Sequence, residues 1–476
     1  MIACVVQFVI FKILYPFADY FSDSYSFIKT AGRKENFNIW PVGYSKFLAA
    51  VHAVTASDFV VVAIQYIVMI VCLGMFFFTI LHFYNPSKTT IRILFFFFFF
   101  NPAVFYLCNY ISADPLFTAL SLLWFTQLLW ILHRPRKWYI WSHAILLFVL
   151  FTLRYNALYY PFISLIAFVF SALPLRHKMI GLLLPATLIV LFVGYTRREA
   201  YKMTGTYQFS VLSGWHWGNN ALYMYPYISV DSRKIPAECT RLHQITAAYF
   251  RAMPEEYKNV TPLYGGFYMR YPQGPLKQYL TQYLKQKQED EEDVKAWGRV
   301  APVMSTYGTH LIQEHPVAYA RYYLLPNTWN YFLPPLEKMA AYNLARKTFP
   351  PRVQRWFQYK SDAARVVSFK AQGRILAFFP LLFMLANLTF IAGMIWYVWT
   401  ATYKREGQRE TSRALALTTV FFLASMAFSV IAAPVAFRYV VFNMFILAAF
   451  SLIISDLIPW EEGEKSAAQS GEGTMT

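Results

Sequence analysis

Two acidic side chains follow the first apolar stretch of the chain. Asp19 and Asp23 stand in PFADYFSDSYSF, among Tyr and Phe side chains that would lower the local polarity. Low polarity makes a carboxylate more basic, and a carboxylate beside an acceptor hydroxyl can take its proton. Asp23 is therefore the first candidate for a general base and Asp19 the second. The structural alternative is helix capping, a common role of Asp ahead of an apolar run.

A further acid lies in NYISADPLFTAL, between the third and fourth apolar stretches. Pro115 directly follows Asp114, and proline favours the first turn of a helix. Asp114 is therefore expected to be the N-cap residue of that helix. A catalytic role is the second hypothesis, because this turn should face the same side of the molecule as Asp23.

Three cations stand at the same predicted boundary of the apolar stretches: Arg154, Lys202 and Arg438. A guanidinium group binds two phosphate oxygens at once in a bidentate contact, so these residues could hold a phosphate-linked lipid. The alternative for each is contact with lipid head groups by a long side chain. Arg438 lies in a very short turn between apolar stretches, which predicts a charge that points inward.

Aromatic and amide side chains are concentrated in SGWHWGNNALYMYPY. Trp215, His216, Asn219 and Tyr223 combine flat rings with hydrogen-bonding groups, as binding of a sugar ring or a lipid head group requires. A packed aromatic loop that docks on the membrane would have the same composition. The two interpretations stay open from the sequence.

The elements that must position these residues are apolar stretches of roughly 20 residues, the length of a membrane-spanning helix. They predict an all-α polytopic membrane protein with about ten transmembrane helices. The stretches are 1–16, 58–84, 93–111, 115–133, 139–153, 157–174, 179–196, 375–401, 414–433 and 440–459.

These stretches divide the chain into four parts. Residues 1–196 form an N-terminal transmembrane module, 197–374 a large and mainly helical loop domain, 375–460 a C-terminal module, and 461–476 a disordered tail. Within the loop domain, we expect turns and an aromatic surface over 205–275, helices over 276–323, and a helix lying in the membrane interface over 350–374.

Lys and Arg are frequent in one set of short connections, which the positive-inside rule makes cytoplasmic. The loop domain is then extracytoplasmic. The net charge of +18 agrees with such connections and with contact to membrane lipids, so no nucleic-acid partner is expected.

The layout and short motifs resemble the GT-C membrane glycosyltransferases, and more narrowly the bacterial protein-mannosyltransferase and aminoarabinose-transferase group. That group has an acidic motif in its first outer loop, often Asp-Glu followed by an aromatic residue. Asp23-Ser24, with Phe27 following, stands in the matching place, but Ser24 departs from the usual Glu. Asp114 in SADPLF corresponds to the group's second acid, NIWPVGYSKFL resembles the end of the first loop, and PVAFRY resembles a late Arg-Tyr pair.

The resemblance implies a glycosyltransferase of the bacterial inner membrane. It would move a sugar from a polyprenyl-phosphate donor to a hydroxyl of a glycan, lipid or protein acceptor, with inversion at the anomeric carbon. No motif of the sequence requires a cofactor. A pair of carboxylates near a phosphate can bind a divalent cation, so such a cation is a second possibility. The alternatives are a transporter or flippase of a lipid-linked saccharide, and a non-catalytic partner in envelope assembly.

Overall fold

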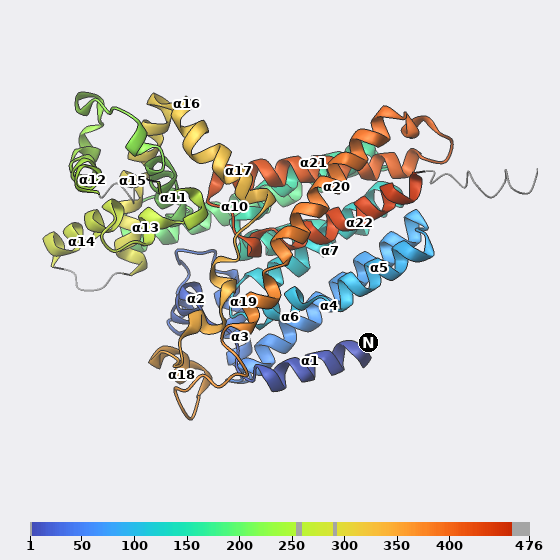
Figure 1. Ribbon diagram of the computed structural model, residues 1–476, viewed down its shortest axis with the longest axis horizontal. Coiled ribbons are helices and arrows are strands. Elements are labelled where there is room, and N and C mark those ends of the chain that lie inside the picture. Colours follow the sequence, from blue (N-terminus) through green and yellow to red (C-terminus); the bar gives the residue numbers. More distant parts are fainter. Residues whose placement is uncertain (1, 254–258, 289–292, 459–476) are drawn as a thin grey trace, which may run out of the picture.

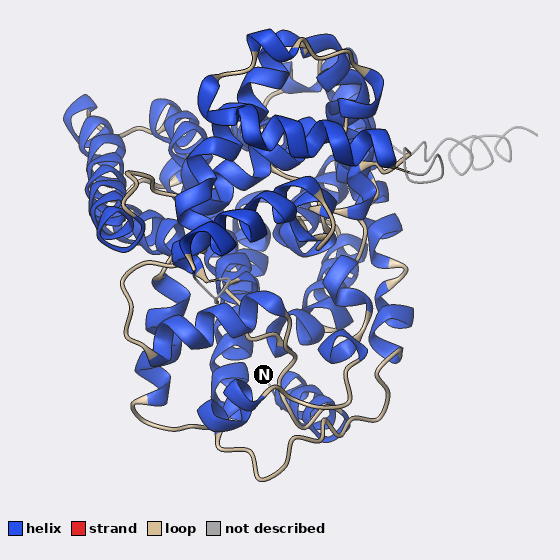
Figure 2. Cartoon of the chain, turned by 90° about the vertical axis from the view of Figure 1, so that its left-hand side faces the viewer, coloured by secondary structure: helices blue, strands red, loops and turns tan. Residues whose placement is uncertain are grey.

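The computed structural model describes residues 2–253, 259–288 and 293–458. In these ranges the chain forms helices and turns and no β-strand (Figure 2). Six of the helices are long and apolar enough to cross a membrane. The all-α fold class is therefore confirmed, with helices of the kind found in multi-pass membrane proteins. The predicted tail, 461–476, lies outside the described residues.

The ten apolar stretches of the sequence coincide with ten helical segments. The six long ones are α4 (Asp58–Tyr84), α5 with α6 (Lys88–Phe99 and Pro102–Asn109), α7 (Asp114–His133), α10 (Leu175–Thr204), α19 with α20 (Ala371–Leu376 and Phe379–Trp399) and α21 (Arg409–Ala432). The shorter ones are α1 (Ile2–Leu14), α8 (Trp138–Leu153), η1 with α9 (Tyr155–Tyr159 and Tyr160–Phe170) and α22 (Val441–Leu457).

Helices that are apolar on every side must lie inside a protein or against lipid, and this bundle has both kinds. In α7, 83% of the most apolar window is buried, with Trp124 and Phe125 fully enclosed. In α10 the buried share is 22%, and Val190 and Leu191 are exposed. The centre of the bundle is therefore α7, and α10 lies at its periphery.

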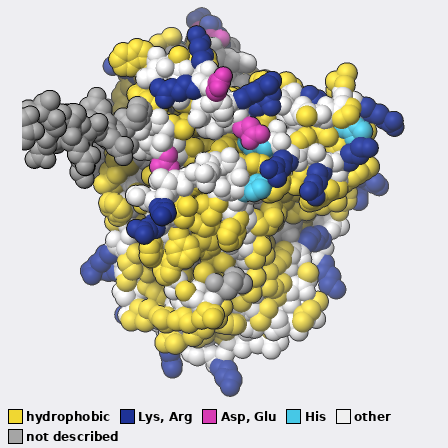
Figure 3. All heavy atoms as spheres, turned by 90° about the vertical axis from the view of Figure 1, so that its right-hand side faces the viewer, with side chains coloured by type: hydrophobic (Ala, Val, Ile, Leu, Met, Phe, Trp, Pro, Cys, Tyr) yellow, Lys and Arg dark blue, Asp and Glu magenta, His cyan; other side chains and the backbone are white. Residues whose placement is uncertain are grey.

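The helices of the bundle run side by side, so their connections gather at two opposite ends (Figure 1). One end, here called the turn end, has the connections 85–87, 134–137, 171–174 and 400–408. The Lys and Arg residues that the sequence assigns to one side lie within these segments or up to five residues after them, and Figure 3 shows Lys and Arg side chains around that face. The other end, the cap end, bears the connections that contain the candidate site residues.

Additional helices cover the cap end (Figures 1 and 2). One group comprises α2 (Ser22–Gly32), α3 (Gly43–His52) and α18 (Pro351–Phe357). The other comprises α11 (Val211–Leu222), α12 (Thr240–Ala252), α13 (Phe267–Arg270), α14 (Pro275–Lys287), α15 (Val294–Glu314), α16 (Pro316–Tyr319) and α17 (Leu325–Phe332). Residues of this second group enclose a hydrophobic core separate from that of the bundle.

The structure confirms helices within 276–323 and corrects two local predictions. Residues 205–275, expected to be turns with an aromatic surface, contain the helices α11 and α12, in which Trp215 and Phe250 are buried. Outside these two helices, Tyr207, Tyr227, Tyr264 and Tyr271 are exposed, as expected. The stretch 350–374 is not one interfacial helix. α18 ends at Phe357 because Gln358 adopts a left-handed conformation with φ of 53°, and α19 begins only at Ala371.

Candidate functional site

Segments far apart in the sequence meet at the cap end. Asp23 lies in the first turn of α2, Asp114 begins α7, and Arg154 ends α8. Arg438 lies in η11 (Phe437–Tyr439), the short turn before α22. The structure therefore brings together four residues that the sequence had singled out separately.

Arg438 is the centre of this cluster. Its Nη1 atom lies 3.2 Å from Oδ2 of Asp23 and 3.1 Å from Oδ2 of Asp114. The side chain is only 4% exposed, which confirms the inward-pointing charge expected from its short turn. Arg154 forms a second ion pair with Asp114. The guanidinium groups of Arg154 and Arg438 both lie 4.5 Å from the ring centre of Tyr439.

Neither carboxylate caps a helix, so the capping interpretation is wrong for both. The N-cap positions are taken by Phe21 before α2 and by Ala113 before α7, and neither of these two side chains caps its helix. At α2, the hydroxyl of Ser24 instead accepts a hydrogen bond from the Phe21 backbone N–H at 3.1 Å. Both aspartates are thus free to point at Arg438.

Three further charged residues complete the cluster, and the sequence reasoning missed them. Lys338 Nζ lies 2.9 Å from Oδ1 of Asp23, and Glu337 Oε2 lies 3.6 Å from Nε of Arg438. Arg270 forms an ion pair with Glu337. Glu337 and Lys338 begin the short helix η8 (Glu337–Ala340). The signal available was a charged pair shortly after two prolines in the apolar stretch YFLPPLEKMAAY.

The cluster has four cations around three carboxylates, and their charges set the pKa values. Burial alone would raise the pKa of Asp23, but Lys338 and Arg438 outweigh burial and hold it well below its usual range. Burial would likewise raise the pKa of Glu337, but Arg270 and Arg438 lower it to about 2. Burial lowers the pKa of Lys338 to about 8, against the attraction of Asp23. At neutral pH the carboxylates of Asp23 and Glu337 are therefore ionised.

Asp19 has a scaffolding position outside the cavity. Its backbone N–H donates to Asn109 and its carbonyl accepts from Ile111, at 2.8 and 3.0 Å. Its Oδ1 accepts a hydrogen bond from the backbone N–H of Asn343 at 2.7 Å. Burial raises its pKa to about 7, although the bond from Asn343 opposes this. Asp19 thus ties the first loop to the chain before α7 and after η8.

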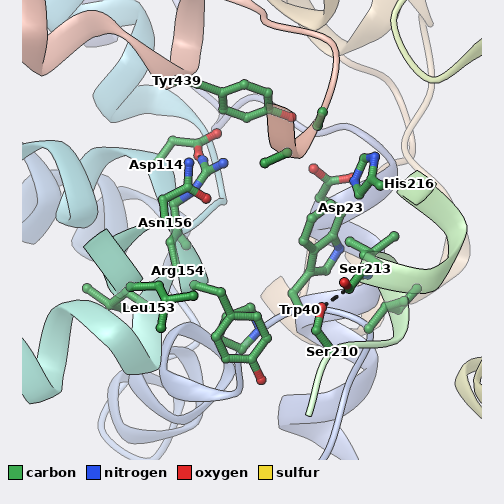
Figure 4. A pocket seen from close by; sticks show the side chains of 18 of the residues that line it. Asp23, Trp40, Asp114, Leu153, Arg154, Asn156, Ser210, Ser213, His216 and Tyr439 are labelled. Carbon is green, nitrogen blue, oxygen red and sulfur yellow. Dashed lines mark hydrogen bonds and ion pairs between the residues drawn. The ribbon is translucent and has the colours of Figure 1, made fainter. Parts of the chain in front are cut away.

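A cavity of about 400 Å³ opens beside the charged cluster. Asp23, Asp114, Arg154 and Arg438 all line it. Figure 4 shows Asp114, Asn156 and Tyr439 on one side, opposite Asp23, His216, Ser213 and Trp40. The rest of the wall is mainly apolar: Leu153, Leu158, Phe209, Leu212, Phe428 and Ile431. Its size lies in the range of small-molecule sites.

The apolar wall reaches the outside of the bundle. Leu158 is 44% exposed and Ile431 is 46% exposed, and both line the cavity. They lie near the cap-end termini of α9 and α21. A ligand with an apolar chain could therefore enter between these helices while its polar part reaches the cations.

Of the other residues that the sequence predicted for substrate binding, one lines the cavity and four do not. His216 lines the cavity, and burial lowers its pKa to about 4, so its imidazole is neutral. Trp215 lies in the second core, stacked on Trp297 with ring centres 4.0 Å apart. Asn219 and Tyr223 are buried there too. Lys202 is half exposed in α10, where it pairs with Glu199 at 2.6 Å.

The carboxylates of the cluster do not fit a divalent cation. Asp23 and Asp114 share one guanidinium nitrogen, and each is paired with a second cation. Oxygen ligands of calcium or magnesium need several free lone pairs around a site of net negative charge. Within the described ranges, no three His, Cys, Asp or Glu side chains group as metal ligands. The arrangement is suited to an anion instead.

Comparisons with protein-family models, with curated proteins and with solved structures find no match to this chain.

Proposed function

We propose that this chain is a GT-C-type glycosyltransferase that moves a sugar from a polyprenyl-phosphate donor to an acceptor hydroxyl. The observation that carries the proposal is the sharing of Arg438 by Asp23 and Asp114 at the wall of a largely apolar cavity. The cavity combines what such a donor needs: apolar walls for the lipid chain, guanidinium groups for the phosphate and a carboxylate beside the space for the sugar.

We further propose that all ten apolar helical segments cross the inner membrane of a bacterium. The cap end, with the large helical part 197–374, would then face away from the cytoplasm. This orientation is supported by the concentration of Lys and Arg in the connections of the turn end.

The donor phosphate would bind at Arg438 and Arg154. Both guanidinium groups line the cavity and both are already held by carboxylates. A phosphate that approaches them competes with Asp23 for Arg438. As Arg438 turns to the phosphate, Asp23 loses part of the attraction that depresses its pKa and becomes more basic. Donor binding would thus prepare the base.

In the proposed transfer step, Asp23 is the base and the two guanidinium groups stabilise the leaving phosphate. The acceptor oxygen attacks the anomeric carbon and forms the new glycosidic bond, while the bond from that carbon to the phosphate oxygen breaks. The electron pair of the broken bond stays on the phosphate, where Arg438 and Arg154 stabilise the added negative charge. The hydroxyl proton passes to Asp23. Attack opposite to the leaving phosphate inverts the anomeric carbon.

The test compares Asp23→Asn with wild type, purified in lipid and supplied with radiolabelled polyprenyl-phosphate sugars and a crude envelope acceptor fraction. Loss of a positioned general base lowers rates by about 10²–10⁴-fold, so we expect transfer to fall by at least about 100-fold. Retained transfer by Asp23→Asn would refute the role of this residue. Label that crosses the bilayer without transfer, equally in both proteins, would identify a transporter.

Asp19→Asn is the matched control, because Asp19 lies four residues earlier and does not line the cavity. The amide oxygen of the new asparagine can still accept the hydrogen bond from Asn343. Burial raises the pKa of Asp19 to about 7, so the substitution removes a charge that is only partly present at neutral pH. We expect transfer within about threefold of wild type. Donor binding, followed by photo-crosslinking, should persist in both variants and shows that their cavities are intact.

A further inference from the structure

A second cavity lies at the cap end between α2, α3 and α18, and none of its lining residues borders the first. Its volume is about 430 Å³, and it is more open than the first. Four cations line it, namely Lys29, Arg33, Arg352 and Arg355, together with His52 and Trp356. No acidic residue of the described ranges lines it. The cavity therefore differs from the catalytic candidate, where carboxylates balance the cations.

The aromatic wall of this cavity has a defined shape. The rings of His52 and Trp356 stack with their centres 3.9 Å apart. Gly32 allows the indole to lie against α2, because a Cβ at this position would come within 3.3 Å of the ring. Nδ1 of His52 is buried without a hydrogen-bond partner among the described residues. The wall of the cavity thus includes two stacked aromatic rings.

The two arginines of α18 have no acidic partner among the residues that the structure describes. Arg352 and Arg355 are exposed, and neither forms an ion pair with any residue in the part of the chain that the structure describes. Arg33 lies 3.7 Å from Glu35, with more than half of its side chain exposed. Like charges gathered around one hollow repel one another, and a bound anion removes that repulsion. A planar guanidinium group favours phosphate in particular.

The cavity lies where the apolar bundle begins. His52 is the last residue of α3, and the apolar helix α4 starts six residues later at Asp58. Between them Val54 is 87% exposed. An exposed apolar side chain next to a basic hollow, at the start of a spanning helix, is the arrangement expected at the level of lipid head groups.

We propose that this cavity binds the phosphate of an anionic head group, with its charge between Arg352 and Arg355 of α18 on one side and Lys29 and Arg33 at the end of α2 on the other. The site is independent of the transfer reaction proposed above. A phospholipid and free phosphate share this chemistry, and the position of the cavity favours the phospholipid.

The test measures binding of fluorescent phosphatidylglycerol to the purified full chain in neutral detergent micelles. The variant Arg352→Gln/Arg355→Gln removes two exposed cations of the cavity. The control Lys360→Gln/Arg365→Gln removes two exposed cations on the same stretch of chain that do not line it. Each cation near an anionic head group contributes about a factor of 5. We expect about 30-fold weaker binding in the cavity variant and a change within about twofold in the control.

Three outcomes decide the proposal. Weaker phosphatidylglycerol binding in the cavity variant alone, without competition from millimolar inorganic phosphate, supports a lipid site. Weaker binding in that variant with full competition by inorganic phosphate supports the same site with free phosphate as its ligand. Equal binding by wild type and both variants, or equal binding of phosphatidylcholine, overturns the proposal.

Discussion

At the residue scale, the candidate site depends on one guanidinium group. Arg438 holds two aspartates that lie more than 90 residues apart in the sequence, and both ion pairs are buried. In its ion-paired state Asp23 has a pKa well below its usual range, because Lys338 and Arg438 outweigh burial. Such a carboxylate is a weak base. In the proposed reaction, an anion would therefore have to bind Arg438 before Asp23 accepts a proton.

The first prediction concerns Lys338, which positions Asp23 and does not itself line the cavity. Burial lowers its pKa to about 8. As pH rises through 8, Lys338 loses its charge, and of the two ion-pair partners of Asp23 only Arg438 keeps its charge. Arg438 is then less available to the donor phosphate, so we expect the KM for the donor to rise above pH 8.

Lys338→Arg tests this cause, because arginine stays protonated throughout this range. We expect the rise in KM between pH 7 and 9.5 to disappear in Lys338→Arg, measured with initial rates at several donor concentrations. An equal rise in both proteins would show that another group titrates there.

At the element scale, α11 presents cavity residues because it packs unusually close to α15. A Cβ at Gly308 of α15 would lie 2.3 Å from the carbonyl oxygen of Trp217, and one at Gly214 of α11 would lie 2.3 Å from that of Ala301. Only glycine permits this distance between the two backbones. His216 and Trp217 follow Gly214 by two and three residues on α11, and both line the cavity.

We therefore expect Gly308→Ala to separate α11 from α15 and to move Trp217. Overpacking of this kind costs about 1–3 kcal/mol, so the Tm in detergent should fall and the KM for the donor should rise. Gly194→Ala in α10 is the control, because no atom lies within 4 Å of a Cβ there. Its Tm should stay the same or increase, since alanine favours helix over glycine. Equal effects of the two substitutions would contradict the packing argument.

The elements also show what the sequence could predict. In lipid, apolar runs of about 20 residues are stable only as helices, so the helices of the bundle could be predicted. The order of these helices also predicts that one end of the bundle bears Asp23, Asp114, Arg154 and Arg438. Lys338 and Glu337 could not, because their approach to Asp23 depends on the path of residues 205–337, which lack a long apolar period. Composition could not distinguish an aromatic surface from the core that encloses Trp215.

At the scale of the whole molecule, the two ends of the bundle differ in chemistry. The turn end has short connections with many cations, whereas the cap end has both cavities and the covering helices. This polarity fits a protein that meets a lipid-linked substrate on one side of a membrane. Under the proposed function, the side of the membrane that the cap end faces would decide which leaflet supplies the donor.

The last prediction tests that side with cysteine labelling. All four native cysteines are buried, so the unchanged chain should react little with a membrane-impermeant maleimide. Ser361→Cys at the cap end and Glu406→Cys at the turn end place a thiol on exposed positions. If the cap end faces away from the cytoplasm, Ser361→Cys is labelled in intact bacterial spheroplasts and Glu406→Cys only in inside-out vesicles. The reverse pattern would place the cavity at the cytoplasmic leaflet and exclude a donor presented outside. Labelling of both variants in spheroplasts would contradict the assignment of the two ends to opposite sides of the membrane.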